Sequence, residues 1–343
     1  MKAIEKPSYD TNRAQLWDVI PLDSPYSCYI ESTRMCNLKC FYCIHATRGV
    51  AGGTMERQGV PLQHLDMDLY DKIVRNVMEF PEPPKRITFS GLGEPLMNPG
   101  LGEMARKLRA VGFGGRIDVI TNAVLLTPVL ADELVESGIS RIQISVQGMT
   151  SGAYKEITGV AVDMEKYISN IRYLFEHRKN TSIYIKIIDA NLKSEAEREE
   201  FHSIFGEICD QISVEHLIVM EQQSREFRTD VVDHQLNLSG GKAQYRKVCA
   251  ATFYFLQVCI DGNVYPCPPP GLPQRFALGN IKDSSLAEIW NGKRRREFLC
   301  GNLRDGYRAF CGDCDCVNYS NAPEEKIDPY ADELLKRLEN RDG

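Results

Sequence analysis

The placement of the cysteines constrains this chain more than any other feature of its sequence. Cys209 is isolated, and the other cysteines form an early and a late group: Cys28, Cys36, Cys40 and Cys43, then Cys249, Cys259, Cys267, Cys300, Cys311, Cys314 and Cys316. The N-terminus lacks the apolar run of a signal peptide, so we expect a cytoplasmic protein, in which structural disulfides are uncommon. Two groups separated by a long cysteine-poor stretch therefore predict two metal sites.

The composition limits the class of protein. Of the 343 residues, 43% are hydrophobic and 26% are charged, and the net charge is -6. Apolar content this high with so low a net charge excludes intrinsic disorder as the overall state. The excess of acidic residues argues against a nucleic-acid partner. No run of about eighteen apolar residues occurs, so we expect no membrane span.

The middle of the chain alternates strand-like and helix-like segments. Strands are predicted at 27–32, 86–90, 116–121, 140–146, 181–189 and 211–219, and helices at 69–80, 101–111, 129–137, 164–177 and 195–208. Thr127, Asp163 and Ser194 are candidate N-caps, and Gly112 and Gly138 are candidate helix ends. Six such units predict an α/β fold with a parallel sheet, either an open partial barrel or a doubly wound sheet.

The pattern within the strands distinguishes these two architectures. Ile142, Ile144 and Val146 alternate with Gln143, Ser145 and Gln147, and the isoleucines of 183–187 alternate with Tyr184, Lys186 and Ile188. A polar inner face favours a partial (β/α)6 barrel whose interior holds a ligand. We expect an N-terminal segment (1–25), the barrel (26–225), a small irregular extension (226–320) that a metal stabilises, and a C-terminal helix (321–343).

The first cysteine group forms one short motif. Cys36, Cys40 and Cys43 lie within eight residues just after the first strand, and three ligands leave one coordination position open, as a catalytic site requires. A zinc loop, or a disulfide with one spare thiol, is the alternative. The C-x3-C-x2-C spacing, with Tyr42 before the last cysteine, resembles the motif of the radical S-adenosylmethionine (SAM) enzymes. The resemblance implies a [4Fe–4S] cluster on these cysteines, with SAM bound to its unique iron.

Further motifs at strand ends support the resemblance. Gly91-Leu92-Gly93-Glu94-Pro95 resembles the Gly-Gly-Glu-Pro segment of that family, in which glycines let the backbone approach a ligand and Glu94 would accept from the SAM ammonium group. Asn122 and Ser145 resemble family positions that contact the ribose or carboxylate of SAM. An ordinary strand-to-helix turn is the alternative for each motif. All of them follow or end parallel strands, where such folds place their active sites.

The second cysteine group resembles the SPASM or shorter "twitch" extension of radical SAM proteins. Cys249, a hairpin with Asp261-Gly262 that leads to Cys267, and Cys311-Gly-Asp-Cys314 carry the resemblance. It implies one auxiliary [4Fe–4S] cluster, because the later cysteines of a full SPASM extension are missing. We expect the ligands to be Cys249, Cys267, Cys311 and Cys314, with Cys316 as an alternate and Cys300 a less favoured one. A zinc ribbon is the other interpretation.

The remaining cysteines lie in apolar stretches. Cys28, Cys209 and Cys259 are interpreted as buried core residues, although any of them, or Cys316, could serve as a hydrogen donor in an epimerisation.

The resemblance implies an enzyme of oxidoreductase or lyase type that makes a 5′-deoxyadenosyl radical. We expect hydrogen abstraction from a small polar substrate, of carbohydrate, aminocyclitol or nucleoside type, leading to oxidation, epimerisation, dehydration or decarboxylation. Lys186 is a candidate substrate or SAM contact, or a salt-bridged lysine inside the barrel. A flavodoxin or ferredoxin would supply electrons. The alternatives are a peptide-modifying enzyme, which the roughly 26 residues before the first strand argue against, and a non-enzymatic zinc module.

Overall fold

The computed structural model describes residues 3–8, 10, 12–218, 232–268, 274–312, 314–318 and 322–340. Within them, the strands form one sheet in the order β1-β7-β6-β5-β4-β3-β2-β8-β9-β10. Their bounds are β1 Ile4–Glu5, β2 Ser27–Ile30, β3 Arg86–Phe89, β4 Arg116–Thr121, β5 Arg141–Val146, β6 Ser182–Ile188, β7 Gln211–Glu215, β8 Phe255–Val258, β9 Asn263–Tyr265 and β10 Gly279–Asn280.

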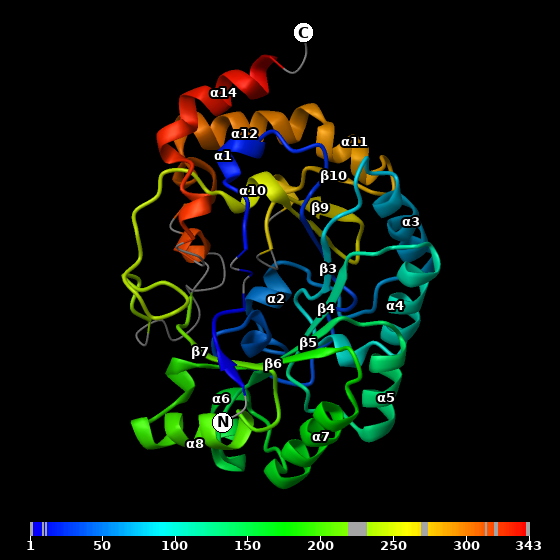
Figure 1. The fold of residues 1–343 in the computed structure, drawn as a ribbon, viewed down its shortest axis with the longest axis vertical. Coiled ribbons are helices and arrows are strands. Elements are labelled where there is room, and N and C mark those ends of the chain that lie inside the picture. The colour runs from blue at the N-terminus through cyan, green and yellow to red at the C-terminus, as the bar shows by residue number, and fades with distance from the viewer. Residues whose placement is uncertain are drawn as a thin grey trace.

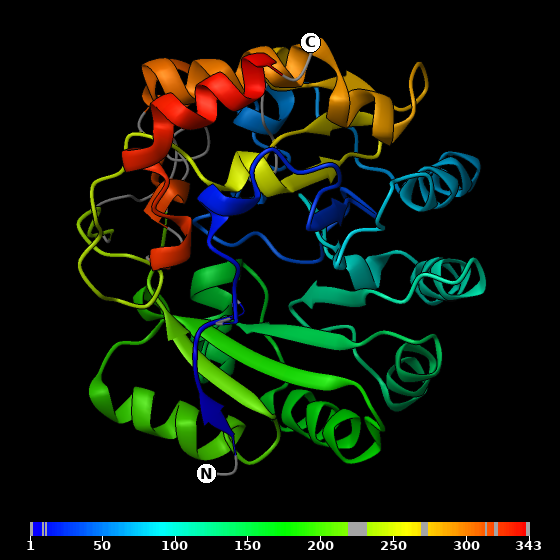
Figure 2. The ribbon, with the colours of Figure 1, turned by 45° about the horizontal axis from the view of Figure 1, so that its top comes forward.

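Helices alternate with these strands, and α3, α4, α5 and α7 lie along the outer side of the sheet (Figures 1 and 2). The α-helices are α1 Leu16–Val19, α2 Thr54–Arg57, α3 Met67–Met78, α4 Leu101–Ala110, α5 Pro128–Glu136, α6 Ser151–Thr158, α7 Met164–His177, α8 Glu195–Phe205, α10 Ala251–Tyr254, α11 Leu286–Asn291, α12 Lys293–Asp305, α13 Arg308–Cys311 and α14 Ala331–Glu339. The short 3-10 helices are η1 Ile44–Thr47, η2 Pro95–Met97, η3 Asp189–Asn191, η4 Gln274–Phe276, η5 Asp315–Asn318, η6 Pro323–Glu325 and η7 Asp328–Tyr330.

Strands β2 to β7 form the predicted partial barrel. Each pairs in parallel with its neighbour in chain order, so the order matches six successive βα units. The barrel does not close on itself, because β1 pairs with the outer edge of β7 and β8 with the outer edge of β2. Ile142 and Ile144 pack in the main core, and Gln143 and Ser145 alternate with them. The polar inner face that favoured a barrel over a doubly wound sheet is confirmed.

The helix boundaries follow the local sequence signals. The side chains of Thr127, Asp163 and Ser194 each accept a hydrogen bond from a backbone N–H of the first turn, at α5, α7 and α8. Gly112 and Gly138 have φ values of +86° and +85°, conformations that favour glycine at a helix end. Caps of this kind satisfy the free N–H groups at a helix start, which is why they predict the start closely.

Helix α6 was not predicted from the sequence. It is only eight residues long, and its N-cap Thr150 and its end at Gly159, with φ +74°, come close after strand β5. A helix of two turns gives too few apolar repeats to be recognised by periodicity. The omission matters for function, since α6 holds the first cysteine loop.

The extension is more regular than predicted. Strand β8 pairs in parallel with β2, and β9 and β10 follow it in antiparallel order. Leu256, Val258 and Trp290 belong to the same buried core as the barrel strands. The expected irregular piece therefore continues the barrel sheet. Its apolar residues pack against the existing core, which supplies the burial that the segment lacks alone.

The predicted C-terminal helix is present as α14, which buries Leu334 and Leu338 beside Leu299 of α12. The predicted domain boundaries at 225/226 and 320/321 fall outside the described residues. Within the described part of the chain, none of the helices has the length and apolar character of a membrane span.

Candidate active site

The loop that carries Cys36, Cys40 and Cys43 follows β2 at the carboxyl end of the barrel strands. Backbone N–H groups of Lys39 and Phe41 donate to the C-terminal end of α6 at 2.9 and 3.0 Å, and Cys43 N donates to Cys40 O at 2.9 Å. These bonds hold the loop compact. The three thiols are close enough that Cys43 and Cys36 both raise the pKa of Cys40, after the larger effect of burial. The structure therefore brings the three predicted ligands together.

Arg48 provides positive charge beside this loop. Burial raises the pKa of Cys36 to about 12, and the Arg48 guanidinium acts in the opposite direction on Cys36 and on Cys43. The guanidinium also donates to the carbonyl oxygen of Cys36. Thiolates are the metal-binding form of cysteine, so a nearby cation favours the ligand state. Arg48 was not singled out from the sequence.

The Gly91–Glu94 turn packs directly on the cysteine loop. A Cβ at Gly93 would lie 2.4 Å from Thr33 O and 2.6 Å from Met35 O, and Glu94 N donates to Met35 O at 2.8 Å. A Cβ at Gly91 would lie 2.7 Å from the side chain of Glu31. Both glycines thus allow close contact with the protein's own chain. This contact fixes the turn against the residues that precede Cys36.

Glu94 is buried and accepts three hydrogen bonds. Its Oε1 accepts from Leu96 N at 3.0 Å and Thr121 Oγ1 at 2.5 Å, and its Oε2 accepts from Asn122 N at 2.7 Å. Burial raises the pKa of Glu94 to about 7, and these donors act against that rise. Both carboxylate oxygens already have protein donors, so the carboxylate ties the ends of β3 and β4 together. Its contact with a SAM ammonium group stays a prediction.

Asn122 and Tyr42 also link strand ends to the cysteine loop. Asn122 Nδ2 donates to Asn37 Oδ1 at 2.8 Å, so the end of β4 contacts the residue that follows Cys36. The Tyr42 hydroxyl donates to Gln147 Oε1 beyond the end of β5 and lies beside the Cys40 thiol. Burial raises the pKa of Tyr42. Asn37 and Gln147 were not chosen as site residues, because single amides carry no spacing signal.

Ser145 and Lys186 lie next to each other in the register of β5 and β6. Lys186 Nζ forms an ion pair with Glu215 Oε2 at 2.5 Å, and Tyr184 donates to Glu215 Oε1 at 3.0 Å. The salt-bridged alternative for Lys186 is therefore what the structure shows. Its role toward substrate or SAM stays a prediction.

A further polar pair follows the ends of β6 and β7 and was not predicted from the sequence. His216 Nδ1 lies 2.5 Å from Asp189 Oδ2, and its Nε2 lies 2.9 Å from Asp233 O. Six scattered histidines gave no spacing signal, so only the fold brings His216 to Asp189. This pair adds to the polar groups at the carboxyl end of the barrel.

The thiols of the extension form a second group. The pKa of Cys267 is raised mainly by burial and then by Cys249, Cys314 and Cys311, so the four predicted auxiliary ligands lie within electrostatic reach of each other. Asn302, which is buried on α12, accepts from Cys249 N at 3.1 Å and donates to Cys249 O at 3.0 Å. This pair of bonds fixes the first ligand against a helix.

The remaining cysteines lie in different surroundings. Cys316 hydrogen-bonds Cys314 and lies near Cys267 and Cys249, so the fifth thiol belongs to the same group. Cys300 packs with the α12–α14 cluster and has Glu339 and Arg304 as its charged neighbours. Cys28, Cys209 and Cys259 are 0%, 1% and 4% exposed and pack in the core, as predicted.

Both thiol groups fit an iron–sulfur cluster in the chemistry of their donors, since every donor is a sulfur and each group is partly buried. Among the described residues, no three Cys, His, Asp or Glu side chains are arranged around a single ion. The cysteines of a [4Fe–4S] cluster bind separate irons, so they need to surround a common space rather than one point.

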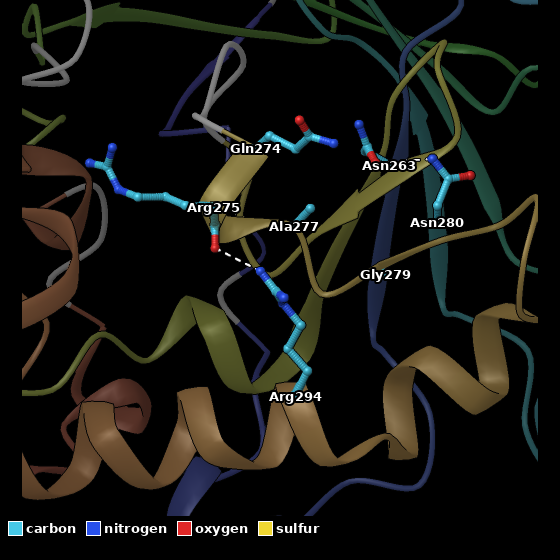
Figure 3. Close-up of a pocket in the computed structure, with 7 residues that line it drawn as sticks. All are labelled: Asn263, Gln274, Arg275, Ala277, Gly279, Asn280 and Arg294. Atoms are coloured by element: carbon cyan, nitrogen blue, oxygen red, sulfur yellow. Dashed lines mark hydrogen bonds between the residues drawn. The ribbon is translucent and has the colours of Figure 1, made fainter.

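A polar pocket of about 480 Å³ opens beside the extension (Figure 3). Arg294 reaches into it from α12 and donates to Arg275 O at 2.9 Å, while Gln274 and Asn263 face it from η4 and β9. The Arg275 guanidinium points away from Asn263 and Gln274, and its charge acts against the burial that raises the pKa of Cys311 to about 12. This side of the extension therefore carries positive charge near an auxiliary thiol.

Comparison with protein families identifies both parts of the chain. The family model described as "Radical SAM superfamily" matches residues 30–199, which include the Cys36–Cys43 loop and the Gly91–Glu94 turn. The model described as "Iron-sulfur cluster-binding domain" (SPASM) matches residues 249–315. The chain belongs to the radical SAM superfamily. It is an enzyme, and its cofactors are SAM and a [4Fe–4S] cluster. Its SPASM-type extension binds auxiliary iron–sulfur.

Similar curated proteins carry out several reactions. This radical SAM protein is 24% identical over 304 residues to a tungsten-containing aldehyde ferredoxin oxidoreductase cofactor-modifying protein of Pyrococcus furiosus, covering 78% of this chain and 81% of that protein. It is 24% identical to the AdoMet-dependent heme synthase of Methanosarcina barkeri, covering 83% and 87%. It is 23% identical to a PqqA peptide cyclase of Granulibacter bethesdensis, covering 79% and 75%.

Solved structures share the fold. BtrN in complex with AdoMet and 2-DOIA matches with a TM-score of 0.54 and 17% identity, over 88% of this chain and 97% of that one. Streptococcus suis SuiB bound to S-adenosylmethionine matches with a TM-score of 0.60 and 16% identity, over 85% and 72%. These similarities establish the partial barrel with a C-terminal extension and leave the substrate open.

Proposed function

We propose that this radical SAM enzyme abstracts hydrogen from a small polar substrate of carbohydrate, aminocyclitol or nucleoside type. When bound, SAM and its cluster supply the 5′-deoxyadenosyl radical, and the auxiliary cluster supplies an acceptor for an electron. The observation that carries the proposal is the charged inner face near the carboxyl end of β6 and β7. A polar, hydroxyl-rich substrate matches such a lining, because buried polar groups require hydrogen-bond partners.

Lys186 is the substrate contact that this lining favours. Glu215 is 2% exposed and accepts from both Lys186 and Tyr184, whereas the Lys186 side chain is 18% exposed. An ammonium group has three N–H donors, so Lys186 can keep its bond to Glu215 and still donate to a substrate oxygen. Glu215 would then hold the ammonium group in place while substrate binds.

The position of the thiols supports oxidation over epimerisation. Epimerisation needs a hydrogen donor that reaches the substrate radical, and Cys28, Cys209 and Cys259 are all buried, with exposed fractions of 0%, 1% and 4%. Cys316 lies among the auxiliary thiols. Oxidation to a carbonyl needs no such thiol, because the auxiliary cluster, when bound, would supply an electron acceptor and a base near the substrate would take the proton.

Peptide modification is the second candidate function. The peptide cyclase similarity and the fold shared with SuiB, which was solved bound to the precursor peptide SuiA, support it. Both candidates use the same barrel and extension, so a substrate assay is needed to separate them.

For electron supply we propose a reduced flavodoxin or ferredoxin, because SAM cleavage requires a one-electron donor of low potential. A reducing cytoplasm suits a chain whose twelve cysteines are all free thiols in the structure.

The test is substrate-dependent formation of 5′-deoxyadenosine. Anaerobically reconstituted enzyme is incubated with reductant, SAM and separate panels of aminocyclitols, sugars, nucleosides and peptides. We expect a polyol or nucleoside to raise 5′-deoxyadenosine formation at least tenfold over the substrate-free rate, and Lys186→Gln to raise KM for that substrate more than it lowers kcat. Stimulation by peptides alone would contradict the proposal.

A further inference from the structure

Glu31 joins three separate parts of the chain. This residue follows β2 and is 0% exposed. Its Oε1 accepts from Leu92 N at 3.0 Å, and its Oε2 accepts from Arg34 Nε at 2.8 Å and from Ile260 N at 3.1 Å. Leu92 belongs to the Gly91–Glu94 turn, Arg34 precedes Cys36 by two residues, and Ile260 starts the hairpin that leads to Cys267. One buried carboxylate thus contacts the elements of both thiol groups.

Arg34 extends this contact across the hairpin. The residue is 8% exposed, and its Nη2 donates to Asp261 Oδ2 at 3.3 Å. Asp261 occupies the tight turn between β8 and β9, where its Oδ1 accepts from Asn263 N at 3.0 Å. A planar guanidinium can bind two carboxylates in fixed directions, which a single-point ammonium group does less well. Arg34 therefore sets both the distance and the orientation of the hairpin relative to the Cys36 loop.

The surroundings of these side chains leave little freedom. A Cβ at Gly91 would overlap the Glu31 side chain, and Cys259, which is 4% exposed, lies beside Glu31 and Arg34. Buried ion pairs add little net stability compared with apolar packing, but removing one partner leaves an uncompensated buried charge. Such networks can select one arrangement over alternatives that would leave a charge unpaired. We therefore expect this network to contribute more to the relative arrangement of the loops than to the free energy of folding.

We propose that Glu31, Arg34 and Asp261 form a positioning junction that fixes the Cys267 hairpin relative to the Cys36 loop, and so sets the separation and relative orientation of the two iron–sulfur sites. The three residues act through the loops that carry the ligands. The consequence for the clusters rests on the auxiliary site described above, whereas the junction itself is a property of the polypeptide.

The first experiment uses metal-free protein and measures amide hydrogen exchange in peptides that cover residues 256–267. We expect Arg34→Gln to speed exchange in this hairpin at least tenfold, and Asp261→Asn to do so to a smaller extent. Asp261 has a side chain that is 39% exposed, so its variant should fold even if Arg34→Gln does not. Arg178→Gln breaks another arginine–aspartate pair, Arg178–Asp210 at 2.8 Å, far from the hairpin in the sequence, and should leave exchange in the hairpin unchanged.

Unchanged hairpin exchange in both Arg34→Gln and Asp261→Asn would overturn the junction. Because this readout needs neither cluster, a failure of the cluster assignment would be seen separately, as missing iron in a protein with normal exchange. Arg34→Lys keeps a positive charge near Glu31 but lacks the guanidinium that bridges to Asp261. Its hairpin should therefore exchange more slowly than that of Arg34→Gln and faster than that of the native protein.

The second experiment uses reduced, fully reconstituted enzyme and records the magnetic interaction between its two clusters by electron paramagnetic resonance. A merely stabilising network would leave the spectrum of the folded variant unchanged. We expect Arg34→Gln to alter the line broadening that arises from coupling between the clusters, at unchanged iron content. Arg34→Lys should give a spectrum closer to that of the native protein. A spectrum identical to the native one in Arg34→Gln would contradict the positioning role.

Discussion

Cys40 is the most buried thiol of the first loop, at 9% exposure, and its pKa is raised by burial and by both neighbouring thiols. A thiol with a raised pKa stays protonated near neutral pH until a bound metal displaces its proton, which is released to solvent. Spacing alone predicted this residue as a ligand. It could not predict Arg48 or Glu31, because their positions depend on side-chain directions that no spacing pattern encodes.

Cys40→Ala should therefore abolish 5′-deoxyadenosine formation from SAM and reductant, measured by chromatography. Loss of one of three cysteine ligands leaves the SAM-binding cluster incompletely held. Cys300→Ala is the matched control, since Cys300 lies apart from both thiol groups, and its variant should keep the native rate. Product formation at the native rate in Cys40→Ala would overturn the assignment of the first loop.

His45 gives the metal-free protein a specific pH dependence. It is 1% exposed, its Nε2 lies 2.8 Å from Leu92 O, and burial followed by the charge of Arg48 lowers its pKa to about 4. The folded state therefore disfavours the charged imidazole. Below pH 6.5 the unfolded chain binds a proton that the folded chain does not, so this contribution to stability falls as pH drops from about 6.5 to about 4.

The measurement is the free energy of unfolding in urea between pH 4 and pH 7.5. We expect the native protein to lose up to about 3 kcal/mol relative to His45→Gln over this range, with most of the loss below pH 6. Parallel pH profiles for the two proteins would show that His45 is not held neutral in the fold.

At the scale of elements, local signals explain what could be read from the sequence. Capping side chains placed the starts of helices α5, α7 and α8 closely, and the positive-φ Gly138 placed the end of α5, because those signals act within one turn. Helix α6 and the pairing of β8 with β2 could not be read in this way. The first is too short for a periodic pattern, and the second joins segments more than two hundred residues apart in the chain.

Gly93→Ala tests the contact between the Gly91–Glu94 turn and the cysteine loop. The added methyl group would meet two backbone oxygens that cannot move aside cheaply, so we expect about 3 kcal/mol lower stability and a clear loss of SAM affinity. Thermal unfolding and calorimetric titration with SAM give the two values. Gly114→Ala is the control, because a Cβ there meets no atom within 4 Å. Equal behaviour of the two variants would refute the contact.

At the scale of the whole molecule, barrel and extension share one core. Trp290 of α11 is 1% exposed and donates from its indole nitrogen to Leu22 O at 2.9 Å, and β8 lies in the barrel sheet. The sequence predicted a separate, metal-stabilised piece because cysteines, prolines and glycines dominate its composition. Composition does not show which existing core a short strand can join.

We expect the metal-free chain to unfold in a single calorimetric transition, since neither part can expose this shared core alone. The calorimetric enthalpy should match the van't Hoff enthalpy. Two separate transitions would show that the extension is an independent unit, with its stability set by its own contacts.

The most direct test of the account is the iron content of anaerobically purified, reconstituted protein. One [4Fe–4S] cluster on Cys36, Cys40 and Cys43 and one on the auxiliary thiols give about eight irons per chain, falling to about four in Cys267→Ala. About four irons in the native protein would contradict the auxiliary cluster, and about twelve would contradict a single one. A colourless protein that binds zinc in place of iron would contradict the account as a whole.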